Sequence, residues 1–135
     1  MSALTVYLAR LMGLSTLVFV VAFMMRSNAI IMATIADSPV MLVYAVFSVA
    51  AGLAIILGHN VWAGGVLPTV VSLTGWLIFA KGLLLLFVNR ETLSLMLERM
   101  HYDQNYIFYF VPAFLLGLYL TYAGFTARAA KSGAK

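Results

Sequence analysis

The sequence predicts one all-α membrane domain, a bundle of four transmembrane helices. The chain of 135 residues is 64% hydrophobic and 9% charged, with a mean hydropathy of +1.06. A soluble domain of this length could not bury so many apolar side chains, so lipid must cover the excess. Four apolar stretches are also long enough to cross a hydrocarbon core of about 30 Å.

Four segments are expected to span the membrane, at residues 4–25, 39–58, 66–88 and 107–126. Pro39 suits the first turn of its helix, because the N–H that proline lacks would have no partner there. Pro68 opens the third span in the same way, and Pro112 falls in the first turns of the fourth. The tail, residues 127–135, is short and basic.

Residues 89–105 form the most polar part of the chain and predict an amphipathic helix on the membrane surface. Asn89 can cap this helix, and Glu91 falls in its first turn, where the helix dipole favours an anion. Apolar residues follow the spacing of one helix face, at Leu93, Met96, Leu97 and Met100. We therefore expect that face to lie among the lipid headgroups.

The two halves of the chain resemble each other. Identical residues recur at offsets of 64 or 65, namely Arg26 with Arg90, Met32 with Met96, Tyr44 with Tyr109 and Gly52 with Gly117. A duplicated helical hairpin would keep its orientation, because each unit holds an even number of spans, and would create a pseudo-two-fold axis along the membrane normal. It also predicts a short surface helix at residues 26–38, between the first two spans, on the same membrane face as residues 89–105. Chance similarity between two apolar hairpins is the alternative.

A group of special residues ends the second span: His59, Asn60 and Trp62. The first two can bond the last helix carbonyls and the tryptophan can anchor at the headgroups, which is a structural interpretation. The alternative is a polar mouth that binds the headgroup of a lipid or quinone. His59 precedes the third span and His101 follows it, so the two histidines cannot share a haem, and we predict no metal and no cofactor.

Trp76 lies near the middle of the third span, although membrane tryptophans favour the interface. A buried indole N–H needs an acceptor, so we expect Trp76 to pack between helices. Small and aromatic residues recur on one face beside it, at Ser72, Gly75, Phe79 and Gly82. Close helix packing explains this groove, and a cleft for a lipophilic ligand is the alternative.

Two cations interrupt the apolar spans. Lys81 lies roughly 21 Å from the start of the third span and about 10 Å from its end, and Arg10 lies nearer the end of the first span. Snorkelling of the long side chains toward the surface is the structural interpretation for both. The functional alternative is that Lys81 and Arg10 contact an anion.

The pattern His-Asn-x-Trp at 59–62, followed by Gly-Trp-x-x-x-x-Lys-Gly at 75–82, resembles a set of small bacterial four-helix integral membrane proteins of unassigned function. The resemblance extends from the second span to the fourth. It implies four spans and a location in the bacterial inner membrane, and it implies no activity.

The sequence favours a non-catalytic subunit or scaffold of a homo-oligomer or a larger membrane-protein complex. Packing explains most of its special residues, and the short loops leave little room for an active site. No nucleophile elbow, phosphate loop or pair of intramembrane carboxylates is present in the sequence. A small oligomeric transporter or channel is the first alternative. A membrane enzyme that acts on a lipophilic substrate at the His59 end is the second.

The expected partners besides protein are membrane lipids. The net charge of +4 comes without a long basic run, which indicates affinity for headgroups and not for nucleic acid. Four positive residues on the side of the termini oppose three on the other side, so we expect both termini in the cytoplasm.

Overall fold

A computed structural model describes residues 1–127, and these residues form six helices and no strand. The helices are α1 (Ala3–Met24), α2 (Asn28–Ala36), α3 (Ser38–Gly58), α4 (Val66–Phe87), α5 (Arg90–Arg99) and α6 (Tyr102–Thr126). Four segments are long and apolar enough to cross a membrane: Ala3–Met24, Pro39–Gly58, Val66–Phe87 and Ile107–Thr126. The prediction of an all-α protein with four apolar spanning helices is confirmed. The tail, residues 128–135, lies outside the described residues.

Short polar side chains begin three of the helices. Ser2 accepts a hydrogen bond from the backbone of Thr5 at the start of α1, and Asp37 caps α3 with Pro39 in its first turn. Asn89 accepts from the N–H of Thr92 at the start of α5, as its place in the sequence predicts. Each cap satisfies a backbone N–H that has no partner within its own helix.

The polar segment 89–105 is not one helix, so that prediction is wrong in its second half. α5 ends at Arg99, and His101 adopts the left-handed conformation with a φ of 47°. A left-handed residue interrupts the helix and redirects the chain. α6 then starts at Tyr102 and contains a further kink at Asn105. Helical periodicity on both sides of His101 hid the turn that the chain needs to enter the last span.

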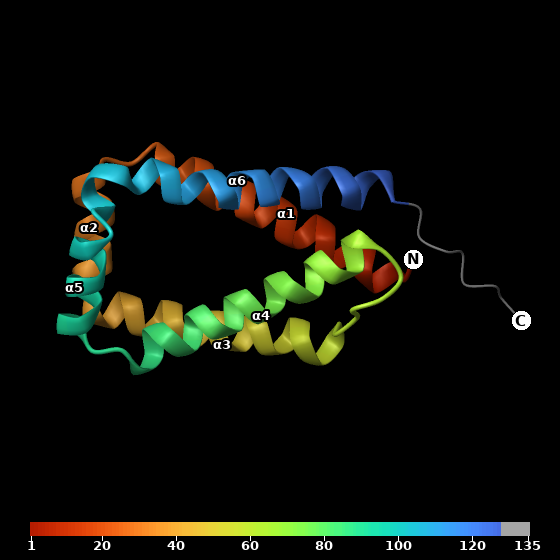
Figure 1. The fold of residues 1–135 in the computed structure, drawn as a ribbon, viewed down its shortest axis with the longest axis horizontal. Helices are drawn as coiled ribbons and strands as arrows, with labels where there is room; N and C mark the ends of the chain where they lie inside the picture. Colours follow the sequence, from red (N-terminus) through yellow and green to blue (C-terminus); the bar gives the residue numbers. More distant parts are fainter. Residues whose placement is uncertain (128–135) are drawn as a thin grey trace, which may run out of the picture.

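The four long helices form two pairs, with α3 along α4 and α1 along α6 (Figure 1). Glycines bring the backbones of each pair together. A Cβ added at Gly52 would lie 2.6 Å from the backbone of Phe79, and one at Gly13 would lie 2.5 Å from the nitrogen of Thr121. The helices of each pair therefore approach closely at positions where no side chain intervenes.

The two pairs converge near the chain termini and diverge toward α2 and α5 (Figure 1). At the convergent end, which we term the closed end, a buried apolar cluster draws on all four long helices: Ala9, Met12, Ile55, Leu67, Val71 and Leu120. At the opposite end α2 contacts α3 and α6, and α5 contacts α6. The bundle is thus packed around one end, with two short helices across the other.

The order of long, short and long helix occurs twice, in α1–α3 and in α4–α6. A two-fold axis that relates the two units would match α1 with α4 and α3 with α6. The contact of α3 with α4 would then have the contact of α6 with α1 as its counterpart, and both contacts are present. Gly52 and Gly117, matched in sequence, each face the other helix of their pair. The matched tyrosines differ, because Tyr44 contacts Lys81 and Tyr109 bonds the carbonyl of Met100. Duplication therefore stays a prediction.

Candidate functional site

His59, which follows α3, lies at the closed end with three hydroxyl residues from the start of α1 and from α4, in a group that we term the closed-end cluster: Ser2, Thr5, His59 and Ser72. His59 is 2% exposed, and Thr5 and Ser72 are equally buried. The Nε2 of His59 lies 2.8 Å from Thr5 Oγ1, and its Nδ1 lies 3.2 Å from Ser72 Oγ. His59 thereby connects α1 to α4, and its ring is buried, whereas a polar mouth would require an accessible ring.

The distances around Ser72 Oγ favour one tautomer of His59. Ser72 Oγ has one hydrogen, and its nearest carbonyl acceptor is Val61 O at 2.9 Å. The same oxygen accepts from the N–H of Val61, also at 2.9 Å. Its remaining lone pair then accepts from His59 Nδ1–H, so His59 Nε2 accepts from the hydroxyl of Thr5. Thr5 Oγ1 accepts in turn from Ser2 Oγ at 2.6 Å. In this arrangement both ring nitrogens and all three hydroxyls have partners.

The direction of these hydrogen bonds determines what the closed-end cluster can do chemically. A serine nucleophile must give its proton to the histidine beside it. In the favoured arrangement Ser72 gives its proton to a backbone carbonyl and receives one from His59, and its side chain is 1% exposed. The geometry is that of a buried structural connection between helices and not of an acyl-transfer site.

Asn60 joins the two tryptophans. Its Oδ1 accepts from Trp62 Nε1 at 2.6 Å and from Trp76 Nε1 at 3.4 Å. Trp76 has the acceptor that its indole needs, but the prediction that it packs between helices is wrong, because the residue is 41% exposed. Successive helical residues are about 100° apart, so a helix that turns Gly75 toward α3 turns Trp76 away from it.

The small residues beside Trp76 serve close packing. A Cβ added at Gly75 would lie 2.5 Å from Ile55 Cγ2, and one at Gly82 would lie 2.7 Å from the nitrogen of Val49. Since α3 covers both glycines, the groove holds a neighbouring helix. This geometry supports the packing interpretation of Gly75 over the ligand cleft.

Arg10 and Lys81 have separate partners in separate helix pairs. Arg10 Nε donates to the carbonyl of Gly124 at 2.8 Å, and its guanidinium lies 4.9 Å from the ring centroid of Phe125. Lys81 Nζ donates to Tyr44 OH and lies 4.8 Å from the centre of that ring. The two cations do not converge on one anion site.

We expect Lys81→Met to fold and assemble as the unchanged protein does. Methionine keeps most of the apolar part of the lysine side chain, and an exposed contact of an ammonium group with tyrosine contributes no more than about 1 kcal/mol to stability. The measurement is the midpoint of unfolding in mixed detergent micelles together with the size of the purified particle. Loss of expression or of the native particle size would show that the cation is needed inside the bundle.

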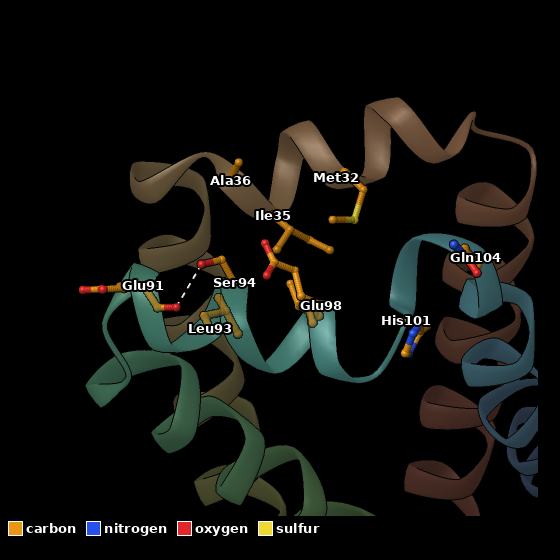
Figure 2. Close-up of a pocket in the computed structure, with 10 residues that line it drawn as sticks. Met32, Ile35, Ala36, Glu91, Leu93, Ser94, Glu98, His101 and Gln104 are labelled. Carbon is orange, nitrogen blue, oxygen red and sulfur yellow. Dashed lines mark hydrogen bonds between the residues drawn. The ribbon is translucent and has the colours of Figure 1, made fainter.

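A cavity of about 620 Å³ lies between α2 and α5, at the end opposite the closed end (Figure 2). A short surface segment at residues 26–38, on the same membrane face as residues 89–105, is expected from the sequence, and α2 forms within it, but nothing in the sequence predicted a cavity between the two. One signal was present: Glu91, Ser94 and Glu98 follow the i, i+3, i+7 spacing of a single helix face. Leu93 and Leu97, expected at the lipid surface, also line this cavity.

The fold and these contacts define a small polytopic membrane protein with four apolar spanning helices. Within residues 1–127, no group of three or more His, Cys, Asp or Glu side chains is placed to hold a metal ion. Comparisons of the chain with protein families, with curated proteins and with solved structures found no match.

Proposed function

We propose that this protein is a non-catalytic membrane subunit that is completed by further copies of itself or by another membrane protein. One observation carries the proposal. Within each spanning helix, the most apolar window has only 17–28% of its residues buried inside the chain. Most of the apolar helix surface is therefore available to lipid or to other spanning helices.

The arrangement of the helix pairs supports a partner as well as lipid. The pairs share the apolar cluster of the closed end and diverge beyond it (Figure 1). Large apolar side chains on the long helices stay exposed, for example Phe47 at 71% and Phe108 at 74%. Helix association in a bilayer depends on close packing, which a second chain could supply along these faces.

The polar groups within or beside the spans support a structural role. Arg10 and Lys81 already have acceptors, and His59 is buried with both ring nitrogens within hydrogen-bond distance of a hydroxyl. A transport path or a hydrolytic site would need such groups to be free for a substrate. The proposal therefore assigns them to folding and assembly.

The proposed location is the bacterial inner membrane, on the resemblance of residues 59–82, with both termini in the cytoplasm, on the distribution of positive residues. A reporter that is active only after export, fused behind Lys135, would be silent in this orientation. Activity of that reporter would reverse the assignment.

The experiment is extraction in a mild detergent of cells that express two differently tagged copies of the chain. Capture through one tag should retain the second tag or a defined stoichiometric partner, and light scattering should give a protein mass above that of one chain. A monodisperse single chain with bound lipid alone would contradict the proposal.

A further inference from the structure

The cavity between α2 and α5 combines apolar walls with a carboxylate. α2 contributes Met32 and Ile35, and α5 contributes Leu97, Ser94 and Glu98. Figure 2 shows the Glu98 side chain reaching from α5 toward α2, with its carboxylate beside Ile35. The cavity can thus hold a ligand whose polar group contacts the carboxylate on one side and whose hydrocarbon part contacts the apolar walls.

A second cavity, of about 470 Å³, adjoins the first one, and we term the two the joined cavities. Ile35 and Leu93 line both cavities. The further walls of the second cavity come from the start of α3 and the end of α4, and include Leu42 and Leu85. α3 and α4 are long and apolar enough to span a membrane, so the second cavity brings the ends of two such helices beside the first cavity.

The charge of the first cavity selects the head group. Its described lining residues include Glu91 and Glu98 but no Lys or Arg. Neither carboxylate forms an ion pair with any residue whose side chain the structure describes. Figure 2 shows the Glu98 carboxylate facing the cavity and the Glu91 side chain extending away from it, so it is chiefly Glu98 that would repel an anionic headgroup and attract a cationic one.

We propose that the joined cavities bind a single-chain amphiphile with an ammonium head. The head lies beside Glu98, with Glu91 adding to the negative potential, and the alkyl chain extends past Ile35 and Leu93 toward Leu42 and Leu85. The volume of about 620 Å³ falls within the range of small-molecule sites, roughly 300–1,000 Å³. This site does not depend on whether the protein assembles with a partner.

The test uses the full chain in nanodiscs of phosphatidylcholine, a neutral lipid, with radiolabelled dodecyltrimethylammonium as the probe and empty nanodiscs as background. We expect saturable binding of one probe per chain, weakened by added salt. Glu98→Gln should weaken binding about fivefold, the upper range for an exposed ion pair. Dodecanol, which has the same chain and no charge, should compete poorly.

Asp37→Asn is the matched control. It removes one carboxylate from the same end of the protein, lies outside the cavity lining and keeps a good N-cap for α3. We expect this variant to bind the probe normally. Ile35→Trp should abolish binding by filling the junction of the two cavities, and it keeps the proposal testable if Glu98→Gln does not fold.

Three outcomes would overturn the proposal. The first is probe binding that is no greater than in empty nanodiscs. The second is an equal loss in Asp37→Asn and Glu98→Gln, which would indicate general attraction to a negative surface. The third is that anionic phosphatidylglycerol displaces the probe at least as effectively as unlabelled dodecyltrimethylammonium does. That result would identify an ordinary lipid as the occupant.

Discussion

Alanine at Gly13 or at Gly52 should disrupt one helix pair in each case. At both positions an added Cβ would overlap backbone atoms of the facing helix, Thr121 at 2.5 Å or Phe79 at 2.6 Å. Backbone cannot rotate away as a side chain can, so the helices must separate. Overpacking of this kind costs about 1–3 kcal/mol and sometimes more. The measurement is reversible unfolding in mixed micelles of dodecylmaltoside and dodecyl sulfate.

Gly58→Ala is the control for this substitution. Gly58 is the last residue of α3, and no described atom lies within 4 Å of a Cβ added there. The same chemical change should therefore leave stability unchanged or raise it slightly, because alanine favours a helix more than glycine does. If Gly13→Ala and Gly52→Ala unfold at the same detergent ratio as Gly58→Ala, the close approach of the helices is wrong.

Thr5→Val should loosen the contact between the two helix pairs. Valine has nearly the shape of threonine, but it cannot donate to Nε2 of the buried His59. Leaving such an acceptor unpaired costs about 1–3 kcal/mol. Unfolding in the same micelles measures the loss, and ¹⁵N spectra of the unchanged protein should show neutral His59 protonated at Nδ1. Spectra that show the Nε2–H tautomer would contradict the direction of these hydrogen bonds.

Two other threonines supply comparisons for the same change. Thr126 Oγ1 bonds carbonyls of its own helix and is exposed, so Thr126→Val should have little effect. Thr121 Oγ1 is buried and, among the described residues, has no hydrogen-bond partner, so Thr121→Val should be neutral or stabilising. Equal effects at all three positions would show that threonine itself, and not its partners, determines the result.

Local patterns in the sequence were enough to locate the spans and several helix starts. Hydropathy reports length and apolar character directly, which is why the four apolar helices lie within one residue of their expected limits. Capping depends on the nearest few residues, which is why Asn89 and Pro39 behave as predicted. The turn at His101 was missed, because a left-handed residue other than glycine leaves little trace in the sequence.

The surroundings of His59 depend on residues far away in the chain. Its partner Thr5 is 54 positions away, and hydroxyls in apolar helices most often bond their own helix carbonyls. Thr5 therefore did not stand out in the sequence, and Ser72 was interpreted only as a small residue of the packing groove. Trp76 was misplaced because hydropathy does not tell which face of an apolar helix meets a neighbour. The cavity between α2 and α5 needs two separate segments to meet, and no single window of sequence contains both.

Because the helix pairs are joined at one end only, a small rotation of one pair relative to the other around the closed end would produce its largest displacement at the opposite end. α4 has 22 residues and is about 33 Å long, so a rotation of about 5° around the closed end would move its far tip by roughly 3 Å. Side chains near the pivot, such as His59, would hardly shift during that rotation. The largest displacement would occur where α2 and α5 lie, so a molecule bound between these two helices would determine the angle between the two helix pairs.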